Sequence, residues 1–140
     1  MKQLKLKNEK LTAAPELLHL LESVSFEYLK LGRSFTLNFR DPDYSATGGG
    51  YHPVEIRINH LQEIEYITDF CYNGEPPYSE LEKCLDFDFG CDRLQSNGMD
   101  FPLLSGVEIF WIWQENFISY FEIGVFQVEI SRDGADHESA

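Results

Sequence analysis

The spacing of the hydrophobic residues changes at Gly32, and this change restricts the fold more than any other feature. Between Pro15 and Lys30, apolar residues recur every three or four positions, which predicts an amphipathic helix. Pro15 fits the first turn of this helix, and Gly32 fits a C-terminal stop. After Gly32, apolar residues alternate with polar ones, which predicts strands that bury one face.

Alternation predicts five strands, and a short link at 59–62 predicts that the second and third form a hairpin. The segments are 35–40, 54–59, 63–72, 85–89 and 126–130. The run from Gly106 to Ile123 has the β-branched and aromatic content of a strand but is too long for one. Its apolar residues also share one helical face, so we interpret it as a second helix. Ser105 and Glu108 have the spacing of a capping box at the start of this helix, and Gly124 is a plausible C-terminal stop at its end.

The order of elements, α-β-β-β-β-α-β, predicts an α+β fold. We expect a mainly antiparallel sheet of about five strands, with two helices packed on one face. A single domain is expected over residues 15–131. A flexible N-terminal arm would precede it at 1–14, and a disordered tail would follow at 132–140.

The chain is strongly acidic, with a formal net charge of −13. Lys and Arg supply most non-specific affinity for nucleic acids, so this charge argues against direct nucleic-acid binding. Anionic membranes are repelled for the same reason, and no membrane association is expected. Two interpretations remain: the charge serves solubility, or it forms a surface for a basic partner.

The chain has three cysteines, Cys71, Cys84 and Cys91, and the spacings between them match no zinc-binding or redox motif. The first residues lack the apolar core of a signal peptide, and no apolar run is long enough to cross a membrane. These features predict a cytoplasmic protein with free thiols. Nothing in the sequence requires a cofactor, and we expect a monomer or a weak dimer.

Polar residues of the predicted strands would share the sheet face opposite the helices. They are Ser34, Thr36, Asn38, Arg40, Glu55, Arg57, Asn59, Glu63, Glu65, Asp69, Asp86 and Asp88. This face is interpreted either as a solvated surface with cross-strand ion pairs or as a recognition surface around Arg40 and Arg57. Asp86 and Asp88, with Asp92, offer oxygen ligands for a metal. Their spacing is not that of an EF-hand, so no metal is predicted.

The segment 39–58 combines an Asp-Pro turn, three glycines and a His-Pro. Asp41 is expected to bond its own backbone two residues on. The glycines at 48–50 permit a backbone anion nest, but the segment lacks the Lys-Ser/Thr of a phosphate-binding loop.

His52 lies two and four residues before Val54 and Ile56, so in an extended strand its side chain would point to the same side as theirs. We therefore expect the His52 side chain to face the core or its rim. It is interpreted as a histidine that is hydrogen-bonded to a carbonyl or carboxylate. Alternatively, it is a general base oriented by Asp41 or Asp43.

Several stretches together resemble the bacterial family catalogued as domain of unknown function 2787. They are Asn38-Phe39-Arg40-Asp41-Pro42, Tyr44-Ser45, Gly49-Gly50, His52-Pro53-Val54-Glu55-Ile56-Arg57, Thr68-Asp69-Phe70, Tyr72, Gly74, Asp86-Phe87-Asp88-Phe89, Trp113, Asn116-Phe117 and Tyr120. The resemblance runs from about residue 15 to 130. It implies a small single-domain bacterial protein, and it supplies no activity and no catalytic residues.

We therefore expect a small, non-enzymatic binding module that engages an unknown protein partner through the polar sheet face and the 41–52 loop. The candidate binding residues are Arg40, Asp41, Tyr44, Gly49, Gly50, His52, Glu55 and Arg57. One alternative is a small enzyme that acts on an anionic substrate through His52 with Asp41 or Asp43. Another is an acidic decoy that mimics nucleic acid.

Overall fold

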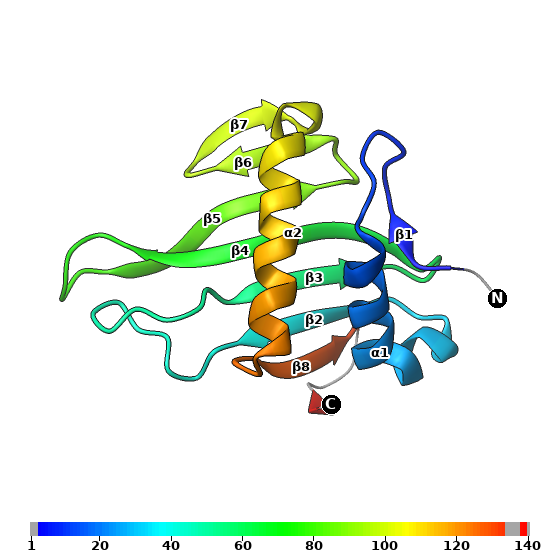
Figure 1. Cartoon of the computed structure of the whole chain (residues 1–140), viewed down its shortest axis with the longest axis horizontal. Coiled ribbons are helices and arrows are strands. Elements are labelled where there is room, and N and C mark those ends of the chain that lie inside the picture. Colours follow the sequence, from blue (N-terminus) through cyan, green and yellow to red (C-terminus); the bar gives the residue numbers. More distant parts are fainter. Residues whose placement is uncertain (1–2, 134–137, 140) are drawn as a thin grey trace.

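A computed structural model describes residues 3–133 and 138–139, and Figure 1 shows one large sheet with two helices on the same face. The helices are α1 (Pro15–Leu31) and α2 (Val107–Glu122), with a 3-10 turn η1 (Leu103–Gly106) before α2. The strands are β1 (Lys5–Leu6), β2 (Phe35–Arg40), β3 (Val54–Ile58), β4 (Glu63–Asn73), β5 (Glu80–Asp88), β6 (Arg93–Ser96), β7 (Met99–Pro102), β8 (Gln127–Arg132) and β9 (Glu138–Ser139).

The strand order in the described residues is β7-β6-β5-β4-β3-β2-β8-β9, and each neighbouring pair is antiparallel. Short β1 runs parallel to the start of β4. The α+β class, the two helices on one face and the β3–β4 hairpin are confirmed. The estimate of about five strands was too low, because β1, β6, β7 and β9 join the five predicted ones.

Helix α1 begins and ends where the sequence predicts. Pro15 occupies its first turn, and Gly32 ends it with a left-handed φ of 65°. The Gly32 N–H donates to the Leu29 carbonyl at 3.2 Å, which satisfies one of the last free acceptors of the helix. Leu17, Leu20 and Leu21 lie buried against the sheet side.

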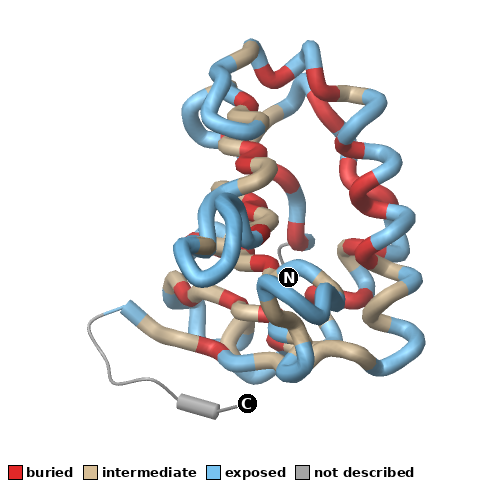
Figure 2. The backbone as a smooth tube through the Cα atoms, turned by 90° about the vertical axis from the view of Figure 1, so that its left-hand side faces the viewer, coloured by how far each residue is buried: buried red, intermediate tan, exposed pale blue. Residues whose placement is uncertain are grey.

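Helix α2 crosses the strands on the same face as α1 (Figure 1). Buried and exposed segments alternate along the helices (Figure 2), and the buried residues of α2 include Phe110, Trp113 and Phe117. Phe110 and Trp113 contact Phe87 of β5, so this side faces the sheet. The helix interpretation of this segment is confirmed, whereas the capping box is not. Gly106 is the N-cap, and no side chain caps the helix there.

The core lies between the sheet and the two helices and is rich in aromatic rings. Phe39 of β2 makes edge contacts with Phe117, Phe121 and Phe126, with ring centroids 5.0 to 6.1 Å apart. Phe110 of α2 contacts Phe87 of β5 at 5.0 Å. Aromatic pairs in such geometry add about 0.5–1.5 kcal/mol each to the apolar area that they bury. Helix α2 is therefore held across the sheet by ring packing.

The N-terminal segment differs from the flexible arm expected for residues 1–14. Leu4, Leu6 and Leu11 are buried in the common core. The Lys5 and Lys7 N–H groups donate to the Gln62 and Ile64 carbonyls at 3.2 and 3.0 Å. Apolar residues among the lysines therefore hold this segment against the start of β4.

The expected tail at 132–140 lies partly outside the described residues. Within them, β9 pairs with β8 through Glu129 and Ile130. Neither described helix is long and apolar enough to cross a membrane.

Candidate ligand-binding pocket

The loop that joins β2 to β3 is closed on itself by one carboxylate. Asp41 Oδ1 accepts from the Asp43 N–H at 2.9 Å, which is the turn predicted for this residue. Asp41 Oδ2 accepts from the Tyr51 N–H, ten residues later, at 3.0 Å. Gly50 between them has a φ of 126°, and a Cβ there would lie 2.9 Å from Asp41 Oδ2. Asp41 therefore fixes the loop, and Gly50 makes this close approach possible.

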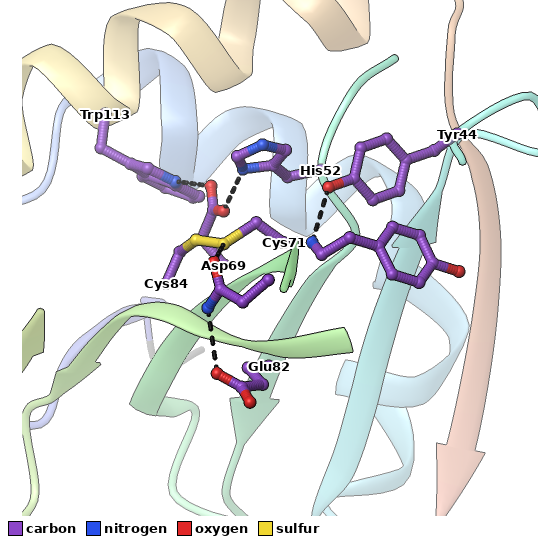
Figure 3. Close-up of a disulfide and its surroundings, with 9 residues drawn as sticks. Tyr44, His52, Asp69, Cys71, Glu82, Cys84 and Trp113 are labelled. Atoms are coloured by element: carbon purple, nitrogen blue, oxygen red, sulfur yellow. Dashed lines mark hydrogen bonds and ion pairs between the residues drawn. A yellow bond between two sulfur atoms is a disulfide. The ribbon is translucent and has the colours of Figure 1, made fainter. Parts of the chain in front are cut away.

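His52 follows this loop and bonds to a carboxylate, as one interpretation of the sequence held, but the partner differs from the two that the sequence suggested. Its Nδ1 lies 2.7 Å from Asp69 Oδ1 on β4. The other carboxylate oxygen, Oδ2, accepts from the indole N–H of Trp113 on α2 at 2.9 Å. Figure 3 shows His52 and Trp113 on either side of this carboxylate. The partner of His52 is therefore Asp69, rather than Asp41 or Asp43.

This pair is only partly exposed, and it changes the acidity of the ring. The side chain of Asp69 is 13% exposed and that of His52 is 44% exposed. The hydrogen bond to Asp69 raises the pKa of His52, although partial burial acts in the opposite direction. Because Asp69 accepts at Nδ1, the other ring nitrogen remains for a ligand.

Asp69 reaches the helix side because β4 contains a bulge. Ile58 pairs with Ile64 and Ile56 pairs with Ile67, so β4 uses one residue more than β3 over this stretch. The extra residue reverses the side-chain parity of the strand beyond it. Asp69 therefore does not lie on the polar face with Glu65, as predicted, but pairs with Val54 on the core side.

A half-open cavity of about 370 Å³ lies between the loop, β4, β5 and α2. Its lining combines aromatic rings with a few polar groups. The lining residues are Gly50, Tyr51, His52, Val54, Asp69, Cys84, Leu85, Trp113, Asn116, Phe117, Tyr120 and Phe126. Concave, mostly apolar sites with a small number of polar groups are the usual form of a ligand pocket.

Two cysteines beside the pocket form a disulfide across the β4–β5 hairpin (Figure 3). Cys71 and Cys84 have Cα atoms 5.7 Å apart, within the usual range for such a bridge. The prediction of free thiols is wrong for these two residues and holds for Cys91, which is exposed. No pattern in the sequence indicates this disulfide, because only the pairing of β4 with β5, with its irregularity near Cys84, brings the two residues together.

Tyr44 connects the loop to the same hairpin. Its hydroxyl accepts from the Tyr72 N–H at 3.0 Å, and the two rings stack at 5.2 Å. The Tyr44 ring also lies 5.4 Å from that of His52. Of the remaining loop candidates, Gly49 pairs with Ser45 across a turn.

The other candidate residues lie on the opposite face of the sheet. Arg57 forms ion pairs with Asp133 and Glu65, and the hydrogen bond to Asp133 chiefly raises the pKa of its guanidinium. Glu55 accepts from the Tyr66 hydroxyl. Arg40 is exposed at the end of β2. The candidate set thus divides between two faces, and only Gly50 and His52 line the pocket.

The aspartates weighed as metal ligands have other partners. Asp86 accepts from the Thr68 hydroxyl at 2.9 Å, and Asp88 accepts from the Cys91 N–H at 3.0 Å. Within the part of the chain that the structure describes, no three metal-ligating side chains gather at one point.

The sequence matches, over residues 15–131, a family described as a protein of unknown function, DUF2787. The chain belongs to this family. No curated protein matches it. The DUF2787 resemblance drawn from the sequence is thereby confirmed. Its stretches include Trp113, Asn116 and Tyr120, which are not among the candidate binding residues, and Asp69, which the sequence placed on the polar face.

Two solved structures from Vibrio cholerae are similar to this DUF2787 chain. The hypothetical protein VC0508, from the VSP-II pathogenicity island, is 35% identical with a TM-score of 0.72, over 85% of this chain and 93% of that one. The conserved hypothetical protein VC1805, from the pathogenicity island VPI-2, is 32% identical to this chain with a TM-score of 0.73. The match covers 86% of this chain and 95% of VC1805. VC1805 is described as sharing structural homology with the human P32 protein.

Proposed function

We propose that this DUF2787 protein is a non-enzymatic binding module whose 41–52 loop engages a protein partner. One planar side chain of the partner enters the pocket beside His52. The observation that carries this proposal is the half-open aromatic cavity between the loop and α2.

The size of the cavity supports a single inserted group. Ligand pockets span roughly 300–1,000 Å³, and the value of about 370 Å³ is near the lower end. Rings from Tyr51, Trp113 and Tyr120 line it, and flat groups stack well on such surfaces. Aromatic and guanidinium side chains are also the commonest anchors at protein interfaces.

The polar groups of the pocket have two roles: one holds other side chains of the pocket in place, and the others are available to contact a ligand. Both Asp69 oxygens already accept hydrogen bonds from the chain itself, so Asp69 orients His52 and Trp113. The remaining nitrogen of His52 and the amide of Asn116 are left to contact the partner. These two groups would select a planar side chain with a polar tip.

The pocket is a better candidate than the polar sheet face. Arg57, the central cation of that face, is held by Asp133 and Glu65 and also donates to Thr36. Arg40 and the sheet carboxylates could still contribute to the partner's outer contacts. The nucleic-acid decoy is less well supported, because Asp86, Glu55 and Glu65 have intramolecular partners there.

A second candidate function is an enzyme that acts on an anionic substrate. The His52–Asp69 pair favours it, because a carboxylate at Nδ1 orients an imidazole as a general base. The earlier candidates Asp41 and Asp43 would then support the loop rather than the reaction.

Indole resonances in 15N NMR spectra test the first proposal, because the chain has two tryptophans in different places. Trp113 lines the pocket and Trp111 does not. We expect the N-acetyl amides of tyrosine, tryptophan or arginine to shift the Trp113 indole N–H saturably and to leave Trp111 unmoved. The leucine amide is the non-planar control.

A His52→Asn variant should weaken the response of Trp113 at least several-fold. Equal shifts of both indoles, or no shift of Trp113 with any planar probe, would contradict the proposal. A Trp113 shift with inorganic phosphate or p-nitrophenyl phosphate alone would favour the enzyme instead.

A further inference from the structure

The outer side of α2 carries a second row of residues, three of them isoleucines, which is distinct from the row that packs on the sheet. Its members recur at alternating steps of three and four along the helix, and all are exposed. This outer seam consists of Ile109, Ile112, Asn116, Ser119 and Ile123. Ile112 is 59% exposed and Ile123 is 66% exposed. In Figure 1, no other helix or strand of the described residues lies over α2 on the side away from the sheet.

Such a stripe is unusual for a surface helix, which normally turns polar residues to water. The inner stripe, with Phe110, Trp113 and Phe117, already attaches α2 to the sheet. The outer seam therefore adds nothing to the core of this domain. Steps of three and four are the spacing at which one helix packs along another in a coiled coil.

The charges beside the seam define the partner. Glu108, Glu115 and Glu122 follow one another at intervals of seven, directly before Ile109, Asn116 and Ile123. In coiled-coil terms they occupy every g position, where charge decides partner choice. Helix α2 contains no Lys or Arg, so nothing on it neutralises this acidic row.

We propose that the outer seam binds a basic amphipathic helix of a partner protein. Isoleucines of the seam would pack against apolar residues of that helix, and the three glutamates would pair with its Lys or Arg.

A second copy of the chain fits this surface poorly. In an antiparallel pair, the glutamate rows of the two helices would face each other. In a parallel pair, the glutamates would face the e positions, which are occupied by Trp113 and Tyr120 and offer no cation. The net charge of −13 adds repulsion between copies.

Three labelled synthetic helices of three heptads each test the proposal with the full chain, by fluorescence anisotropy. The first has Ile or Leu at a and d and Lys at e and g. The second replaces each Lys with Glu, and the third replaces each a and d residue with Ser. We expect the first to bind at least about tenfold more tightly than either of the others.

Variants locate the site. Ile112→Asp should lower affinity for the basic helix at least about tenfold, and circular dichroism should show a retained fold, because this side chain is exposed. Leu31→Asp, at an exposed position of α1, is the matched control and should bind normally. Changing Glu108, Glu115 and Glu122 together to Lys should transfer the preference to the acidic helix.

Three results would overturn the proposal. Equal binding of the first and third peptides would mean that charge alone attracts them. Unchanged binding by Ile112→Asp would place the contact elsewhere. A dimer in sedimentation that Ile112→Asp abolishes would identify a second copy as the occupant.

Discussion

At the scale of single residues, the carboxylates of Asp41 and Asp69 do most to shape the pocket. Asp41 closes the loop through two backbone N–H groups, and Asp69 joins that loop to the helix above the sheet. Each uses both oxygens, so neither is a free charge. Hydrogen bonds to a charged group contribute about 1.5–3 kcal/mol each when they are well formed. The position of His52 thus depends on bonds from three different segments.

The raised pKa of His52 makes stability depend on pH. A histidine with a raised folded-state pKa contributes its full stabilisation below the unfolded value of about 6.5 and loses it as pH rises through the folded value. We therefore expect wild-type and His52→Asn proteins to differ most in free energy of unfolding near pH 5.5. This difference should shrink toward about pH 8.5.

Urea unfolding at several pH values measures this difference. His60→Asn is the matched control, because His60 is exposed in the turn between β3 and β4. A difference that grows with pH would show that His52 is neutral when paired with Asp69.

At the scale of elements, the β4–β5 hairpin combines a bulge with a covalent cross-link. The disulfide lies between the pocket and the exposed end of the hairpin, and Cys84 lines the pocket itself. Between the disulfide and the exposed end of the hairpin, the Asn73 side-chain amide donates to the Glu82 carboxylate at 3.0 Å. Because the Tyr44–Tyr72 contact ties the loop to this hairpin, the hairpin also supports the position of His52.

Removing the cross-link should destabilise the fold. The two cysteines are 13 residues apart, and closing a loop of this length stabilises a protein by about 3 kcal/mol in the chain-entropy description. We expect Cys71→Ala/Cys84→Ala to lose about 2–3 kcal/mol in urea unfolding. Dithiothreitol should lower wild-type stability similarly and leave the double variant unchanged. Equal stability of oxidised and reduced wild-type protein would disprove this contribution.

At the scale of the whole molecule, the excess of carboxylates is the dominant electrostatic feature. Ion pairs such as Lys7–Glu65 and Lys10–Asp92 lie at the surface, where each contributes about 0–1 kcal/mol. A net charge of −13 opposes compaction through repulsion over the entire surface. Repulsion should therefore outweigh these pairs.

Salt should stabilise the protein for this reason. The Debye length falls from about 20–30 Å to a few Å between about 10 mM and 1 M salt, which screens surface repulsion. We expect the melting temperature in about 500 mM NaCl to exceed that in about 20 mM. Sucrose at equal osmolality is the uncharged control. A fall in melting temperature with NaCl would show that attractive pairs dominate.

The local pattern of the sequence determined the helices, the central strands and the turn at Asp41. Helical spacing between Pro15 and Lys30 and alternation after Gly32 follow from which side chains meet the core, and each can be recognised within one segment. Strands β6 and β7 were missed because segments of four residues are too short to establish a period. The DUF2787 resemblance pointed to the pocket residues without indicating that they meet.

Tertiary structure alone decided the site. A single extra residue in β4 turned Asp69 from the polar face to the pocket, and alternation cannot predict it because a bulge depends on how two strands pair. The pairing of β4 with β5 brought Cys71 close to Cys84, and the path of α2 across the sheet placed Trp113 over Asp69. These contacts link residues far apart in the chain, so they are set by the packing of whole elements rather than by any local pattern.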